Sequence, residues 1–282
     1  MYLPKVILDT SAINALEDQG ADSAPLMRRL AWEFDVLLGF TNLEELISTP
    51  SERERIALVA RFERLRRPGK CIVPPNEIVC LMISSHARAP REFVWKNVDV
   101  FLSAALEQRL AQRDYLHDEF CERQKVQNRG IEKRFRGVLE SPRPALDEIP
   151  PQERPGSFAE LVASDAVDGR FAWNYVRGLY GRVSGKELTE PGTNEFVAAC
   201  PPLRALALGQ LMGFYSWSLR GHRGRKAAAG RNDLSMTAYL PYCDCFITND
   251  CSQRQALSEV TREAEIACRV LSLAEFQCAV AG

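Results

Sequence analysis

The chain has little histidine and no long apolar run. Only three histidines occur in 282 residues, and no Ser-His-Asp arrangement is apparent, so we expect no covalent nucleophile. No apolar stretch approaches the roughly 20 residues that cross a bilayer, so no membrane partner is expected. The first residues show no charged leader followed by an apolar segment, which predicts a cytoplasmic protein without a signal peptide.

The cysteines form no framework, and the charges nearly balance. There are nine cysteines, an odd number, and none has the C-x-x-C spacing of common zinc sites. This pattern indicates free thiols in a reducing compartment. The formal net charge of −1 gives no overall attraction to nucleic acid. A nucleic-acid partner would therefore have to be held by local basic patches and by metal.

Short apolar runs alternate with amphipathic helical segments at both ends of the chain. Such alternation is typical of a parallel sheet with crossover helices, so we predict the α/β class. The expected strands are residues 4–9, 35–40, 70–73, 245–248 and 269–271. Near the last two strands, residues 233–240 are expected to form a short helix that Pro241 ends.

The middle of the chain has a different character. It is rich in Glu, Gln, Arg and Leu at helical spacing, and five prolines fall within residues 141–156. We therefore predict a core in two halves, residues 1–75 and 200–282, separated by a mostly helical insertion with a proline-rich linker, residues 76–199. Within the insertion we expect long helices over residues 91–139 and turns over residues 184–194.

Four acidic residues lie at the ends of predicted strands or near the starts of predicted helices. They are Asp9 in VILDTSA, Glu45 in FTNLEELIS, Asp233 in RNDLSMTAYL and Asp250 in CFITND. Functional groups of parallel sheets gather at the carboxyl ends of the strands, so the four carboxylates can converge. A cluster of carboxylates is costly unless a cation neutralises it, and hard divalent cations prefer oxygen ligands. The cofactor expected is Mg²⁺ or Mn²⁺.

The ordered set of four resembles the PIN-domain nucleases. The resemblance comes from a first strand ending in Asp-Thr-Ser, a Glu-Leu after the second strand, a helix-opening Asp, and a Thr-x-Asp, followed by the ending RVLSLAEF. It covers residues 1–75 and 200–282, whereas the middle departs from the family. The matching acids are Asp9, Glu45, Asp233 and Asp250, with Thr10, Ser11 and Thr248 as polar neighbours.

The resemblance implies a PIN-like sheet and a metal-dependent endoribonuclease. The metal would lower the pKa of a bound water that attacks phosphorus in line, leaving a 5′-phosphate and a 3′-hydroxyl. The expected substrate is RNA, most simply a single strand. We leave open a homodimer and a protein inhibitor, the latter if the chain is the toxin of a toxin–antitoxin pair. Without metal, at least one carboxylate is expected to bind a proton near neutral pH.

Two acidic assignments have alternatives. Glu44 and Glu45 are adjacent and cannot both face the site from one helix, and Glu45 is preferred because it lies in the Glu-Leu pair. Asp244 precedes its strand, so it is either a surface turn residue or a supporting polar residue.

Basic residues occur in two groups. The first lies just before Asp233 and is either a phosphate-binding loop or a solvated loop without specific contacts; its members are Arg220, Arg223, Arg225, Lys226 and Arg231. The second lies on the predicted long helix and alternates with glutamates, which favours a solvated helix face. Its members are Arg123, Lys125, Arg129, Lys133, Arg134 and Arg136.

Two other functions compete with the nuclease. A haloacid-dehalogenase-type phosphatase also begins with a strand ending in Asp, but it needs a second Asp where this chain has Ser11. A non-catalytic PIN-like scaffold that binds RNA or protein is the main alternative. Such a scaffold has no need of all four acidic residues.

Overall fold

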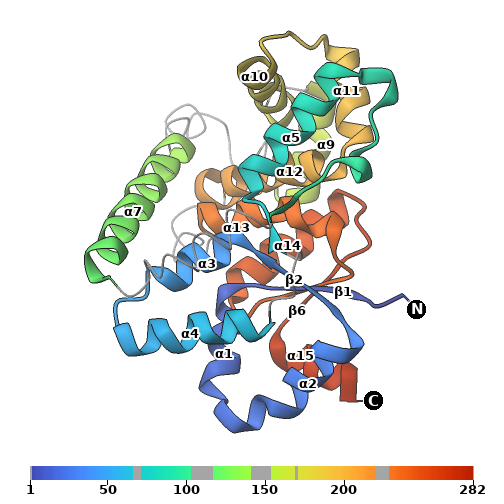
Figure 1. Ribbon diagram of the computed structural model, residues 1–282. Coiled ribbons are helices and arrows are strands. Elements are labelled where there is room, and N and C mark those ends of the chain that lie inside the picture. Colours follow the sequence, from blue (N-terminus) through green and yellow to red (C-terminus); the bar gives the residue numbers. More distant parts are fainter. Residues whose placement is uncertain are drawn as a thin grey trace.

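A computed structural model describes residues 2–65, 71–102, 117–140, 154–168, 171–219 and 229–281. The chain is an α/β protein built on a six-stranded sheet with the order β4-β3-β2-β1-β5-β6 (Figure 1). Five of these strands are parallel, and β4 pairs with β3 in the antiparallel direction. The strands are β1 (Lys5–Leu8), β2 (Asp35–Gly39), β3 (Cys71–Ile72), β4 (Phe101–Leu102), β5 (Cys245–Ile247) and β6 (Arg269–Leu271). The predicted class and the five predicted parallel strands are confirmed.

The sheet has two buried faces, and successive side chains of each strand enter different cores. Ile7 of β1 pairs with Leu37 of β2 and Phe246 of β5, and all three enter one core. Their neighbours Val6 and Leu8 enter the other core. A strand buried on both faces needs an unbroken apolar run, which is the pattern that marked β1, β2 and β5 in the sequence.

One face of the sheet is covered by helices from the two ends of the chain (Figure 1). Apolar side chains of the first two helices, of the helix that follows β2 and its neighbour, and of the last helix fill this core. The elements are α1 (Thr10–Asp18), the 3-10 helix η1 (Gly20–Ser23), α2 (Ala24–Glu33), α3 (Phe40–Ile47), α4 (Glu52–Leu65) and α15 (Leu273–Ala281).

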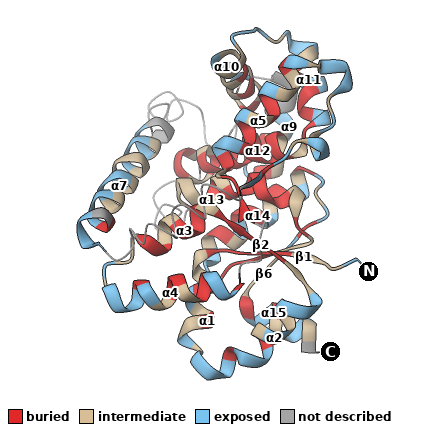
Figure 2. Ribbon diagram, in the orientation of Figure 1, coloured by how far each residue is buried: buried red, intermediate tan, exposed pale blue. Residues whose placement is uncertain are grey.

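The opposite face is covered by helices of the middle and of the second half together, with the buried helix α12 at the centre (Figure 2). Because α5, α10, α11 and α12 share one core with the sheet, the middle packs onto the sheet core. The elements of this layer are α5 (Pro75–Arg88), α9 (Phe158–Asp168), α10 (Ala172–Ser184), α11 (Glu190–Ala199), α12 (Pro201–Phe214), the π-helical turn η6 (Tyr215–Leu219), α13 (Arg231–Ser235), η8 (Met236–Tyr242) and α14 (Cys251–Glu263). The division at residues 75 and 200 stays a prediction.

Several local predictions were wrong. Residues 90–97 form two 3-10 turns, η2 (Pro90–Glu92) and η3 (Trp95–Asn97), and the strand β4 follows them, where long helices were expected. Half of the expected turn at 184–194 is helical, because the Thr189 hydroxyl caps α11 by accepting from the Gly192 amide. Pro241 lies inside η8 instead of ending the helix before it. The proline-rich linker lies outside the described residues up to position 153.

The long helix α7 (Asp118–Glu140) lies beside α3 and η6 (Figure 1). Its first turn is tied to α4 by Arg55, whose side chain is fully buried. The Arg55 guanidinium donates to the Asp118 carboxylate at 2.6 Å and to the Thr49 carbonyl at 2.8 Å. A buried cation needs such partners, so this contact positions α7 over the carboxyl edge of the sheet.

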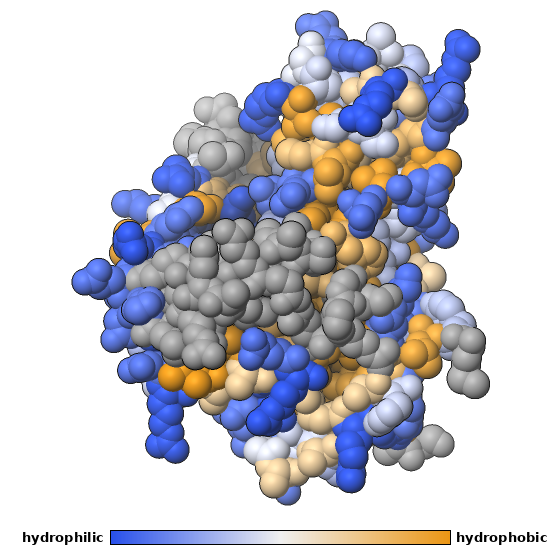
Figure 3. Space-filling model, in the orientation of Figure 1, coloured by the Kyte–Doolittle hydropathy of each residue, from blue (hydrophilic) through white to orange (hydrophobic). Residues whose placement is uncertain are grey.

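The surface in the same orientation carries hydrophilic side chains along its rim, and apolar residues gather in the upper half of the view (Figure 3). Among the described residues, no single helix has the length and apolar composition to cross a membrane. The pair Glu190–Ala199 and Pro201–Leu219 passes that test only when taken together, and it is bent by 109°.

Candidate metal centre

The four acidic residues lie along the carboxyl edge of three neighbouring strands. Asp9 follows β1 and caps α1, whereas Glu45 lies in α3, which follows β2. Asp250 follows β5 and caps α14, and Asp233 lies in α13. The negative charges of Asp9, Glu45 and Asp250 all act on the Asp233 carboxyl. The fold therefore brings together four acids from four separate segments.

Asp9 is held by two hydroxyl groups and one backbone amide. Its Oδ1 accepts from the Ser11 hydroxyl at 2.8 Å and from the Ala12 amide at 2.9 Å. Its Oδ2 accepts from the Thr248 hydroxyl at 2.9 Å. Ser11 and Thr248, which the sequence named as polar neighbours, thus fix the orientation of the Asp9 carboxylate.

Glu45 is held by Thr10 and by a residue that the sequence did not single out. Its Oε2 accepts from the Thr10 hydroxyl at 2.5 Å, and its Oε1 accepts from the Asn232 amide at 3.1 Å. Behind Thr10, Asn42 donates to its hydroxyl at 3.3 Å and accepts from the Gly39 backbone amide at 3.0 Å. A Cβ on Gly39 would lie 2.9 Å from Asn42 Oδ1, so glycine is needed at the end of β2.

The other two carboxylates bond to backbone amides at helix starts. Asp233 Oδ2 accepts from the Gly230 amide at 2.8 Å. Asp250 Oδ1 accepts from the Ser252 and Gln253 amides at 2.8 and 2.9 Å, and from the Ser252 hydroxyl at 2.5 Å. The second oxygen of each carboxylate, Oδ1 of Asp233 and Oδ2 of Asp250, accepts no hydrogen bond from the described residues.

Burial makes three of the four acids hard to ionise, and repulsion between the carboxylates adds to the effect at two of them, Asp9 and Asp233. Burial, with a smaller effect of the Glu45 charge, raises the pKa of Asp9 to about 6. Burial and the charges of Glu45, Asp250 and Asp9 raise the pKa of Asp233 to about 7. Burial also raises the pKa of Glu45. Burial alone would raise the pKa of Asp250, but the hydrogen bonds from Ser252 and Gln253 outweigh burial, so the pKa of this carboxyl is lowered.

A cavity of about 970 Å³ opens in front of Glu45, Asp233 and Asp250, and α7 forms its opposite wall. Three cations of α7 line this wall: Arg129, Lys133 and Arg136. All three side chains are exposed, in agreement with the predicted solvated helix face, and they also line the cavity.

The cavity wall also fixes one of these cations in place. The Arg136 guanidinium forms an ion pair with Glu132 at 2.7 Å and lies over the Trp217 ring, 4.8 Å from its centroid. Glu132 in turn accepts from the Arg231 backbone amide at 2.9 Å. The acidic wall and the basic wall of the cavity are thus joined by hydrogen bonds at one point.

Two predicted contributors have other positions. Asp244 lies at the amino end of β5, where it accepts from the Tyr2 hydroxyl and the Lys5 amide. At about 3.3 Å per residue, the strand separates it by roughly 13 Å from Thr248, so its supporting role is withdrawn. Arg231 lines a smaller, neighbouring cavity. The other members of the predicted basic loop lie outside the described residues; they are Arg220, Arg223, Arg225 and Lys226.

The donors of this centre are all oxygen atoms, which suits Mg²⁺ or Mn²⁺. Across the described ranges, however, no three His, Cys, Asp or Glu side chains are grouped closely enough to hold an ion directly. Mg²⁺ commonly keeps several waters and binds only one or two carboxylates. A divalent cation at these residues would therefore have to keep most of its waters.

In comparisons with known proteins, no family model, no curated protein and no solved structure matches the chain.

We expect Mn²⁺ binding to strengthen with pH, because the ion and protons compete for the same oxygens. With pKa values of about 6 for Asp9 and about 7 for Asp233, the affinity should rise roughly 20-fold between pH 6 and pH 8. Calorimetry in two buffers of different ionisation enthalpy should show proton release at pH 6.5. Asp233→Asn should flatten the dependence. An affinity independent of pH without proton release would contradict the site.

Proposed function

We propose that the chain is a PIN-like, Mg²⁺- or Mn²⁺-dependent endoribonuclease that hydrolyses phosphodiester bonds. One observation carries the proposal: acids from three segments, Glu45, Asp233 and Asp250, line one cavity together with three cations of α7. The charge of the fourth acid, Asp9, acts on Asp233. Carboxylates that resist ionisation suit a bound cation, and a basic wall suits the phosphates of a nucleic acid. The order of Asp9, Glu45, Asp233 and Asp250 in the sequence supports the resemblance to PIN-domain nucleases.

The residues of the chain would divide the work. Ser11 and Thr248 orient Asp9, and Thr10 and Asn232 orient Glu45, so that these carboxylates present fixed oxygens. A divalent cation held there would supply an acidified water and offset charge on the phosphoryl oxygens. Arg129 and Lys133 would bind the flanking phosphates and keep the strand in register.

The test is cleavage of a labelled single-stranded RNA with Mn²⁺, with Mg²⁺ or with a chelator. We expect metal-dependent cleavage by the wild type and its loss in Asp9→Asn. Asp244→Asn is the matched control, since it removes an acid from the opposite end of the sheet, and it should cleave normally. If the wild type binds RNA but does not cleave it with either metal, the non-catalytic scaffold becomes the better interpretation.

A further inference from the structure

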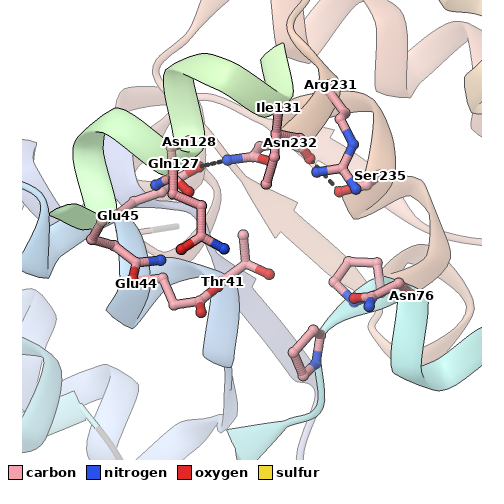
Figure 4. Close-up of a pocket in the computed structure, with 13 residues that line it drawn as sticks. Thr41, Glu44, Glu45, Asn76, Gln127, Asn128, Ile131, Arg231, Asn232 and Ser235 are labelled. Carbon is pink, nitrogen blue, oxygen red and sulfur yellow. Dashed lines mark hydrogen bonds between the residues drawn. The ribbon is translucent and has the colours of Figure 1, made fainter. Parts of the chain in front are cut away.

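A second, smaller cavity adjoins the metal centre. It lies between α3, the start of α5, α7 and α13, and has a volume of about 240 Å³. Glu45, Asn128 and Asn232 line both cavities. Figure 4 shows the labelled side chains surrounding a common opening, with Glu44 and Thr41 from α3 across from Arg231 and Ser235 of α13. A group bound in this opening would therefore sit directly beside a group bound at the carboxylates.

The lining of this cavity combines amides, the two carboxylates of Glu44 and Glu45, the cation Arg231 and a few apolar surfaces. Three amide side chains come from α7, one from α5 and one from α13: Gln124, Gln127, Asn128, Asn76 and Asn232. Glu44 supplies a carboxylate, and the rings of Pro74 and Pro75 together with Ile131 supply apolar surface. A flat heterocycle with polar edges is complementary to this lining, because its edges form hydrogen bonds and its faces pack against apolar groups.

The size of the cavity limits its occupant. Pockets for drug-sized ligands begin at about 300 Å³, and each water in the liquid takes about 30 Å³. A volume of about 240 Å³ therefore suits one heterocycle rather than a stacked pair of bases. A base in a duplex already uses its pairing edge, so only an unpaired base could enter and be read by these groups.

We propose that this cavity binds one unpaired guanine base of the RNA strand, next to the phosphate that is cleaved. The proposal rests on the nuclease function above and adds its base specificity. Guanine presents two adjacent donors, N1–H and the N2 amino group, which a carboxylate such as Glu44 accepts together. Its O6 and N7 are acceptors, which the amide NH₂ groups of α7 can serve. Adenine offers Glu44 only one donor on its pairing edge, beside an acceptor.

Glu44 and Glu45 thus have separate tasks. Glu45 receives hydrogen bonds from Thr10 and Asn232 and takes part in the carboxylate group. Glu44, one residue earlier on α3, lines only the smaller of the two cavities. The two neighbours would contact the base and the phosphate from adjacent positions of one helix.

The test uses otherwise identical single-stranded RNAs that carry guanine, inosine or adenine at one position, with no other guanine. Inosine lacks only the 2-amino donor. We expect the wild type to cleave beside guanine about 10-fold faster than beside adenine, with inosine between them. Glu44→Gln should reduce the guanine preference and improve cleavage beside adenine, because an amide pairs with adenine. Glu54→Gln, an exposed glutamate on α4, is the matched control and should keep the wild-type preference.

Binding separates a failure of this proposal from a failure of the nuclease. The same three RNAs are titrated by fluorescence anisotropy into Asp9→Asn and into Asp9→Asn/Glu44→Gln. A guanine preference that depends on Glu44 supports the cavity even if the wild type cleaves nothing. Equal binding and equal cleavage of all three RNAs would overturn the base-reading cavity and leave the nuclease in place. A preference unchanged by Glu44→Gln would overturn it as well.

Discussion

Asp233→Asn should abolish RNA cleavage and at the same time make the metal-free protein more stable. The loss of cleavage should be on the order of 10³-fold, since a carboxylate that offsets charge near the reacting phosphate contributes several kcal/mol. The gain in stability follows from the pKa of Asp233, which the fold raises from an ordinary 3.8 to about 7. A residue that only capped α13 would show neither effect.

The direction of the stability change follows from proton binding. Between pH 4 and pH 7 the folded protein holds a proton on Asp233 that the unfolded chain releases, so the contribution of this group falls as pH rises. At pH 8 Asp233 is ionised in the folded protein, so the full cost of burying its charge lowers the free energy of unfolding. Asparagine removes this cost and keeps an acceptor for the Gly230 amide. We expect a gain of about 4 kcal/mol, or roughly 10 °C in melting temperature, in chelator at pH 8.

Asp250→Asn is the matched comparison. Hydrogen bonds from Ser252 and Gln253 lower the pKa of Asp250, so its charged form is favoured by the fold. We expect this variant to lose cleavage without any gain in stability. A stability gain in both variants, or in neither, would contradict the electrostatic description of the centre.

Replacing two cations of the cavity wall, Arg129→Gln with Lys133→Gln, should weaken RNA binding about 10-fold. Both side chains are exposed on the same wall of the cavity as Arg136. Each phosphate contact with a single strand contributes about 0.7 to the slope of log affinity against log salt, so the slope should fall by roughly 1.4. Anisotropy titrations of Asp9→Asn carrying these changes, at several salt concentrations, measure both quantities.

The same helix provides the control. Arg123 and Arg134 are exposed and line neither of the two cavities, and replacing both with glutamine removes the same charge from the same helix. This pair should change affinity and salt slope little. Equal losses for the two pairs would mean that α7 attracts RNA only through its overall charge.

The sequence predicted the sheet and the four acids because both depend on local patterns. Each long strand is an apolar run ended by a polar or small residue, as in Val6–Asp9 and Val36–Gly39. Once the strands are parallel, topology places the residues after them on one edge, so Asp9 and Asp250 needed no further information. The raised pKa values also agree with the expected proton near neutral pH.

The rest depended on tertiary contacts that leave little trace in the sequence. The basic residues of α7 are distributed around the helix. The contact of Arg55 with Asp118 and the packing of α7 against α3, α12 and η6 decide which of them face the acids. Asn232 precedes Asp233, but an amide next to an acid forms no recognisable pattern. The strand β4 has two residues, too few to show a period of two.

The short outer strands of the sheet have a consequence for assembly. In the described residues the sheet ends in β4, with two residues, and in β6, with three. Such edges offer another chain very little free backbone to pair with, which protects against edge-to-edge aggregation. A second copy of the chain or an inhibitor would therefore have to bind through side chains on the helices. Recognition of that kind can be changed by single surface substitutions without disturbing the sheet.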